Sequence, residues 1–161
     1  AEPAPAKAAE PAPGKAPEKA AEPPKPTPEQ AAQIAALCKQ LGEGQYGSQG
    51  ACQQLIAIGP AAMPALLKAL KDPRPPARWW AAAAVSNLAT DEGYAAILDV
   101  LRTEAHSFVR STAVYYLRHF RTKARKDIWP VVEEMLADKD PEVARWALRL
   151  MVEDSAPATN S

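Results

Sequence analysis

Apolar positions along this chain recur in blocks that repeat at a nearly constant interval. A short apolar stretch ends at the acid Asp72, and a second stretch follows with Ala77 and Ala81 on one face. The layout returns twice, so that the anchor positions Ala77, Val109 and Val143 lie 32 and 34 residues apart. In each copy an acid lies five residues before the anchor and an alanine lies four residues after it. A fixed period in this range indicates a stack of helical hairpins, none of which can bury its apolar face alone.

Capping residues and helix breakers divide the repeat region into eight predicted helices. Thr27 and Pro28 open the first helix, Gly59 stops the second, and Asp140 precedes Pro141 at the start of the last. The predicted helices span residues 28–41, 48–58, 60–71, 76–89, 91–102, 106–120, 126–137 and 141–153. Because the apolar residues follow helical spacing throughout, we expect an all-α fold built from four helix pairs.

Alanine, proline, lysine and glutamate dominate the first 27 residues. This segment has no Ile, Leu, Val or aromatic side chain, so it cannot bury enough apolar surface to offset the entropy of ordering. We expect residues 1–27 to form a disordered, extended tail. This tail is either an inert linker or a tether that extends to a partner. Residues 28–154 then form the helical repeat domain, and residues 155–161 form a frayed C-terminus without periodicity.

The composition of the 161 residues narrows the classes of partner and location. The 19 basic and 19 acidic residues give a formal net charge of zero, so no overall field draws the protein to nucleic acid or to an anionic membrane. No apolar run approaches the ~20 residues of a transmembrane helix, which indicates a soluble or peripherally attached protein. The first residues, Ala1, Glu2 and Pro3, resemble a mature N-terminus after signal-peptide cleavage. We therefore expect a periplasmic or secreted protein, while an arbitrary chain boundary would leave a cytoplasmic location open.

The hairpins, with their turn acids and second-helix arginines, resemble the HEAT-repeat family in its short bacterial or phycobilisome-lyase-like form. The resemblance covers about residues 28 to 153 and is strongest over 59–89. It implies a right-handed α-solenoid of about four helical hairpins. It also implies that turn acids and arginines early in the second helices link neighbouring units; here the acids are Asp72, Glu104 and Asp138, and the arginines are Arg78 and Arg110.

Two units depart from this pattern. In the first helix pair, Ser48 stands where the third pair has Arg110. In the last pair, Ala144 stands at the basic position and Arg145 follows one residue later, about 100° around the helix. We therefore expect the row of ion pairs to be interrupted in the last helix pair. Exposed pairs contribute about 0–1 kcal/mol each, so apolar packing sets most of the register.

Cys38 and Cys52 are the two cysteines of the chain. They lie 14 residues apart on the two predicted helices of the first hairpin, whose antiparallel arrangement can bring the sulfurs together. In an exported protein a disulfide here would brace the most irregular unit, and closing a loop of this size stabilises by about 3 kcal/mol. Two reduced, buried thiols are the alternative. Neither cysteine has a histidine nearby, so the sequence offers no zinc ligand set.

Candidate catalytic residues are scarce. His106 and His119 are the only histidines, and a separation of 13 residues turns them about 140° apart on a helix. The adjacent Glu133 and Glu134 point about 100° apart, which is poor geometry for paired carboxylates. No nucleophile elbow, phosphate-binding loop or dinucleotide fingerprint occurs. We therefore expect a protein that is not an enzyme and that needs no metal or cofactor.

Basic residues concentrate where the third helix pair ends. Residues 102–126 hold seven basic side chains against one acid, while residues 127–161 hold eight acids against three basic side chains. The densest run contains Arg118, Arg121, Lys123, Arg125 and Lys126. These cations either satisfy the carbonyls and dipole of a helix C-terminus or form a docking patch for an acidic partner or a phosphate backbone.

Adjacent aromatic residues form a second set of candidate docking residues. Trp79 and Trp80 lie in one predicted second helix, and Tyr115 and Tyr116 lie in the next. Neighbours on a helix point about 100° apart, so one member of each pair belongs to the core while the other can reach the concave face. There Trp and Tyr make effective binding anchors. Packing of all four side chains in the core is the alternative.

Three functions compete on this sequence. The resemblance implies a non-catalytic scaffold or accessory subunit of a larger periplasmic or membrane-associated complex, which docks another protein on its concave or basic surface. Nucleic-acid binding through the basic segment 102–126 is the first alternative, and the zero net charge counts against it. A HEAT-like lyase or glycosylase is the second alternative, although no catalytic motif of those enzymes is matched here.

Overall fold

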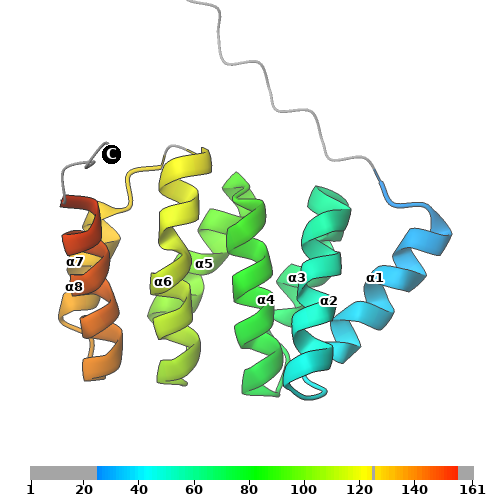
Figure 1. Cartoon of the computed structure of the whole chain (residues 1–161), viewed down its shortest axis with the longest axis horizontal. Coiled ribbons are helices and arrows are strands. Elements are labelled where there is room, and N and C mark those ends of the chain that lie inside the picture. The colour runs from blue at the N-terminus through cyan, green and yellow to red at the C-terminus, as the bar shows by residue number, and fades with distance from the viewer. Residues whose placement is uncertain (1–24, 125, 156–161) are drawn as a thin grey trace, which may run out of the picture.

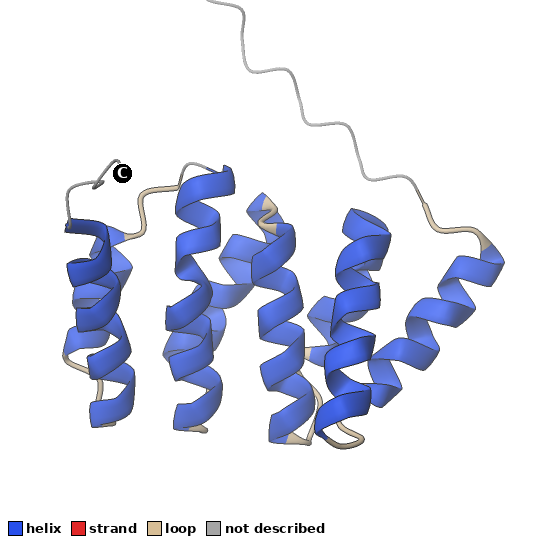
Figure 2. Ribbon diagram, viewed as in Figure 1, coloured by secondary structure: helices blue, strands red, loops and turns tan. Residues whose placement is uncertain are grey.

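The structure is a computed structural model of the chain in which residues 25–124 and 126–155 are described. Within them the backbone forms eight α-helices and one 3-10 turn, η1, at Gly59–Ala62 (Figures 1 and 2). The helices are α1 Pro28–Gln40, α2 Gln45–Ile58, α3 Met63–Ala69, α4 Pro75–Leu88, α5 Asp91–Thr103, α6 Ser107–Ala124, α7 Trp129–Leu136 and α8 Pro141–Ser155. The predictions made for residues 1–24 and 156–161 lie outside the described part of the chain.

The helices stack in two layers along one axis (Figure 1). α2, α4, α6 and α8 form one layer, and α3, α5 and α7 lie behind it, so successive hairpins add one helix to each layer. The helices of the first layer pack on one another far more extensively than those of the second. A stack curves towards the layer whose helices lie closer together, which makes α2, α4, α6 and α8 the inner layer. The predicted all-α solenoid of four hairpins is confirmed.

Local sequence explains where these helices begin and end. Thr27 opens α1 with a capping box: its Oγ1 accepts from the Gln30 backbone N–H at 3.2 Å, and the Gln30 side chain accepts from the Thr27 N–H at 3.1 Å. Thr90 opens α5 by accepting from the Gly93 N–H at 3.0 Å. Gly59 ends α2 with a φ of 84°, a conformation that favours glycine because it has no Cβ.

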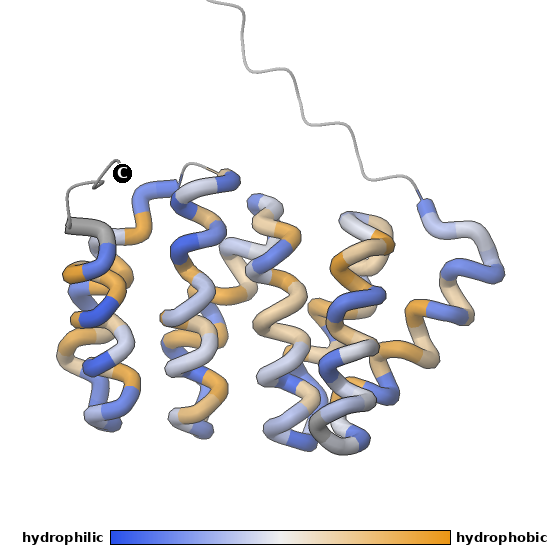
Figure 3. The backbone as a smooth tube through the Cα atoms, viewed as in Figure 1, coloured by the Kyte–Doolittle hydropathy of each residue, from blue (hydrophilic) through white to orange (hydrophobic). Residues whose placement is uncertain are grey.

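Alanines on α4 explain how closely the inner layer packs. The consecutive residues Ala81, Ala82, Ala83 and Ala84 are all buried, and α2 and α6 both pack on this helix. Small side chains permit short distances between helix axes. Larger residues complete the core, of which Phe120 is the largest that is fully buried. Figure 3 shows apolar residues along every helix and hydrophilic residues concentrated at the turns.

α2 and α6 extend furthest beyond their predicted bounds. α2 begins at Gln45 instead of 48, and α6 continues to Ala124 instead of ending at 120. The extension of α6 follows directly on Phe120, which is fully buried and anchors that end of the helix in the core. As a result, Arg121 and Lys123 lie on a helix and not in the connection to α7.

One segment of the described residues, Tyr46–Ala69, is long and apolar enough to cross a membrane by length and composition. The expectation that no apolar run reaches such a length is therefore corrected. The segment is not one continuous α-helix, because it contains α2, η1 and α3 and the chain turns at Gly59. Its Leu55 and Leu66 side chains are fully buried, so packing between the helices of this stack already accounts for them.

Candidate functional site

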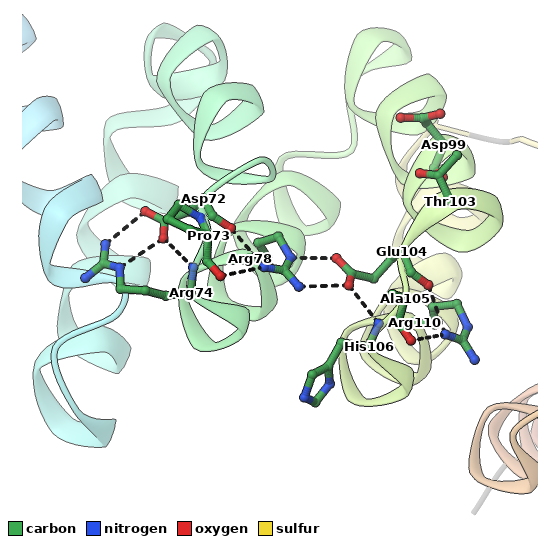
Figure 4. A network of polar contacts seen from close by, with 10 residues as sticks. All are labelled: Asp72, Pro73, Arg74, Arg78, Asp99, Thr103, Glu104, Ala105, His106 and Arg110. Carbon is green, nitrogen blue, oxygen red and sulfur yellow. Dashed lines mark hydrogen bonds and ion pairs between the residues drawn. The ribbon is translucent and has the colours of Figure 1, made fainter.

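A row of arginine–carboxylate pairs connects neighbouring hairpins. Figure 4 shows the Arg78–Glu104 pair of this row. Arg78 on α4 donates from Nε and Nη2 to the two carboxylate oxygens of Glu104 at 2.6 and 2.8 Å. Nη1 of the same guanidinium donates to the carbonyls of Asp72 and Pro73 at 2.9 and 3.2 Å. Arg78 therefore joins the turn of its own hairpin to the turn of the next one by a bidentate pair, the strongest form of this contact.

Arg110 repeats this geometry one hairpin further along. It donates to both carboxylate oxygens of Asp138 at 2.9 and 2.8 Å, and to the carbonyls of Glu104 and Ala105 at 2.9 and 3.0 Å. The Arg110 side chain is 4% exposed and the Asp138 side chain 8%, so this pair is shielded from water. Hydrogen bonds from the arginines hold the pKa of Glu104 and of Asp138 below the ordinary carboxyl value.

Arg74, which the sequence analysis does not single out, completes the row at its N-terminal end. Because Ser48 stands at the basic position of the first hairpin, Asp72 pairs with Arg74 of its own turn, whose Nε and Nη2 lie 2.9 Å from the two carboxylate oxygens. The guanidinium also donates to the Lys39 carbonyl of the first hairpin at 3.4 Å. A Cβ on Gly42 would lie 2.6 Å from the guanidinium carbon, so a larger residue there would displace Arg74. In the sequence, the Asp-Pro-Arg triplet at 72–74 indicates this pair, because it places an arginine two residues after the turn acid.

The row stops in the fourth hairpin. Ala144 stands at the position of Arg110, and Arg145 pairs with Glu142 on its own helix. The Trp146 indole also donates to Glu142, at 3.0 Å. These polar contacts stay within α8, as expected from the displaced arginine.

Cys38 and Cys52 are both free in the structure, which therefore does not show the predicted disulfide. The Cys52 thiol is buried and donates to the Trp80 carbonyl at 3.7 Å, which directs it to α4 and not to α1. Cys38 is half-buried against the core. Burial raises the pKa of Cys52 to about 11 and also raises the pKa of Cys38. Both residues are therefore thiols at neutral pH.

The predicted basic patch is divided among several neighbouring helices. Lys123 donates from Nζ to the Asn87 carbonyl near the end of α4 at 2.7 Å. Lys126 pairs with Asp91 at the start of α5, also at 2.7 Å. The contact of Lys123 is the one that a cation makes with the carbonyls of a helix C-terminus.

Arg118 and Arg121 face two further helices. Arg118 lies 3.8 Å from the centroid of the Tyr115 ring and 3.9 Å from the Glu153 carboxylate on α8. Arg121 lies over the Trp129 ring on α7, 5.3 Å from its centroid. Arg125 lies outside the described residues. The described cations thus contact α4, α5, α7 and α8 separately.

Aromatic side chains do converge, on the inner layer. The Trp79 ring centroid lies 4.4 Å from that of Trp80 and 4.9 Å from that of Phe108 on α6. Both tryptophans are half-buried, whereas Phe108 is 53% exposed. Phe108 gives no signal in the sequence, because it is a single aromatic residue in the first turn of its helix. Only the packing of α6 on α4 brings it to Trp79.

The second aromatic pair continues this cluster towards α8. The Tyr115 ring centroid lies 4.9 Å from Tyr116 and 5.1 Å from Trp146, in edge-to-face geometry. Both tyrosines are half-buried, as the tryptophans of α4 are. The four predicted aromatic residues therefore belong neither wholly to the core nor wholly to the surface.

Two grooves flank Phe108. We call the first, of about 590 Å³, the tryptophan groove; the residues that define it are Gly42, Pro75, Pro76, Trp79, Trp80 and Phe108. The second, of about 340 Å³, is the tyrosine groove, defined by Trp79, Phe108, Tyr115, Tyr116 and Trp146. Because Trp79 and Phe108 line both, the two grooves share one aromatic wall on the inner layer.

A third groove, of about 720 Å³, lies on the opposite layer, between α3 and α5. Its charged lining includes Lys71, Asp72, Asp99 and the Arg78–Glu104 pair, so both signs of charge are present. Those two partners are already hydrogen-bonded to each other across the hairpins. Among residues 25–124 and 126–155, no group of three or more His, Cys, Asp or Glu is placed to hold a metal ion.

A comparison with protein-family models finds one match: the model described as HEAT repeats covers residues 34–118, which is more than half of the chain. The matched region runs from α1 into α6 and contains the Arg78–Glu104 pair together with Trp79 and Phe108. Searches of curated proteins and of solved structures find no match.

Proposed function

Because the chain belongs to the HEAT-repeat family, we propose that it is a non-catalytic protein-interaction scaffold or accessory subunit of a larger complex. Its partner docks on the inner layer, over the aromatic wall that Trp79 and Phe108 form. Helical-repeat proteins commonly use the extended concave surface that their curvature creates for binding. In this chain the inner layer of helices provides that concave surface.

The exposed Phe108 side chain is the observation that carries this proposal. It is 53% exposed although it packs on Trp79 and lies between two grooves. A partner that covers it would bury a large apolar side chain that already has a fixed neighbour, and such aromatic residues dominate the affinity of interfaces. The tyrosine groove next to it adds Tyr115 and Trp146, so the covered surface would extend from α4 to α8.

The arginine row supports this function by fixing the geometry of the surface. Arg78 holds the α5–α6 turn at Glu104, only four residues before Phe108. Arg110 is two residues after Phe108 and holds the next turn at Asp138. A docking surface whose hairpins are locked in register loses little conformational entropy on binding.

The alternative of nucleic-acid binding receives less support. Phosphate binding needs several cations that act together on one surface. Lys123, Lys126 and Arg118 instead make contacts with three different helices. Export to the periplasm stays a prediction, to which the free cysteines add nothing.

Affinity capture from the source organism tests the proposal. Tagged full-length chain is compared with Phe108→Ala and with Leu136→Ala, which removes a 39%-exposed apolar side chain from α7 on the outer layer. We expect Phe108→Ala to weaken binding of the captured protein by at least ~10-fold, because aromatic anchors contribute ~2 kcal/mol. Leu136→Ala should bind as wild type does. Equal capture by the two variants, with circular dichroism showing both folded, would remove the inner layer as the docking surface.

A further inference from the structure

The tryptophan groove differs from the other two grooves because no Lys, Arg, Asp or Glu lines it. Aromatic and proline residues make up most of its lining, together with Gly42 and Gly44. Ser48 and His106 are the polar residues that line it. A groove of this chemistry does not select a phosphate or an acidic peptide. It fits an extended chain with small apolar side chains, and proline-rich segments dock on aromatic-lined grooves in this way.

The chain itself carries a sequence of that class. Residues 2–7 read Glu-Pro-Ala-Pro-Ala-Lys, and residues 10–15 read Glu-Pro-Ala-Pro-Gly-Lys, so one six-residue motif occurs twice, eight residues apart. Each copy presents two prolines and an alanine between two charged residues. Prolines at alternate positions favour the polyproline II conformation, which lowers the entropy lost on binding.

We propose that the tryptophan groove is a binding site for a proline-rich segment and that residues 1–24 of the same chain occupy it. The apolar Pro-Ala-Pro core of a motif lies against Trp79, Trp80 and Phe108, and its glutamate and lysine remain in water at the two ends. The inference concerns the isolated chain. Its site shares Trp79 and Phe108 with the proposed docking surface, but the experiment below needs no partner, so the two proposals fail separately.

The length of the chain permits this contact. α1 has 13 residues and is therefore about 20 Å long, which is the distance from its first turn to the turn that contains Gly42. Residues 16–27 connect the second motif to α1 and span up to about 37 Å in the polyproline II conformation. The tether keeps the motif near the groove at an effective concentration on the order of millimolar, so even a weak contact is populated.

Paramagnetic relaxation in the full-length chain tests the proposal. A nitroxide is attached to Ala16→Cys in a Cys38→Ala background, in which the buried Cys52 remains unlabelled. The indole N–H signals of the four tryptophans are then recorded. We expect Trp79 and Trp80 to lose most of their intensity, while Trp129 on α7, in the outer layer, keeps its intensity.

Three controls decide between explanations. Replacing Pro3, Pro5, Pro11 and Pro13 by alanine keeps the length and charge of the segment, and should restore the Trp79 and Trp80 signals. High salt should leave the broadening unchanged, because no charged side chain lines the groove. Equal broadening of all four indoles, or no effect of the alanine substitutions, would overturn the proposal. A mixture of nitroxide-labelled chain and isotope-labelled chain without nitroxide tests whether the segment comes from the same molecule. Broadening of the indole signals of the isotope-labelled chain would assign the groove to a segment of a second copy and overturn the intramolecular assignment.

Discussion

Breaking the most buried pair of the arginine row should destabilise the protein far more than breaking an exposed one. Asp138→Ala leaves the Arg110 guanidinium, 4% exposed, without its carboxylate. Removing one partner of a buried pair costs about 3–5 kcal/mol, and the retained hydrogen bonds to the Glu104 and Ala105 carbonyls place this case near the lower end. Asp138 also accepts from the Asp140 N–H at 2.8 Å, a hydrogen bond worth about 1 kcal/mol. We therefore expect a loss of about 4 kcal/mol in the free energy of unfolding.

Urea unfolding followed by circular dichroism at pH 7 measures this loss. The matched control is Glu134→Ala, which breaks the pair with Arg102. These two side chains are 46% and 55% exposed, so the free energy of unfolding should stay close to that of the wild type. The double variant Arg110→Met/Asp138→Leu should recover most of the stability, because it removes both charges and keeps the volume. If Asp138→Ala were no more destabilising than Glu134→Ala, the row would not set the register of the hairpins.

Three further predictions follow from individual contacts. Arg78 depresses the pKa of Glu104, so the stability from this pair is fully present above the ordinary carboxyl pKa of about 4.3 and is lost as the pH falls through the depressed value. The urea midpoint of the wild type should therefore fall below about pH 4. The midpoint of Glu104→Gln should fall less over the same pH range. Gly42→Ala should displace the Arg74 guanidinium and cost about 1 kcal/mol, while in an Arg74→Ala background the same change should be nearly neutral in urea titrations; equal costs in both backgrounds would contradict the close approach. Burial raises the pKa of Cys52 to about 11, so an aromatic disulfide reagent should modify Cys38 first and Cys52 only on unfolding. Two thiols should be counted in denaturant. A count of zero without reductant would reinstate the disulfide.

The hairpins and most of the arginine row could be predicted because their signals are local. Helical spacing, the turn acids and the proline or threonine at helix starts are each set by a few consecutive residues. The pairs Arg78–Glu104 and Arg110–Asp138 join residues of neighbouring units, but the repeat fixes their separation along the chain. A family resemblance therefore sufficed to name both partners.

The candidate docking surface could be predicted only in part. Trp79 and Tyr115 belong to adjacent aromatic pairs, which the sequence shows, whereas Phe108 stands alone in the sequence. Likewise, the cations of the basic run look like one patch along the chain, yet in the structure Lys123, Lys126 and Arg121 contact three different helices. Spacing along the chain does not fix the direction of a side chain across a packed interface.

The sequence by itself determined that this protein is a stack of paired α-helices, because apolar periodicity and helix termini are properties of short segments. The tertiary structure decided which side chains meet between units: Cys52 turns to α4 and not to Cys38, Arg74 replaces the arginine missing at Ser48, and Phe108 reaches Trp79. The physical reason is that such contacts depend on the distance and angle between neighbouring helices. Those are set by the packing of the whole core and not by any one segment.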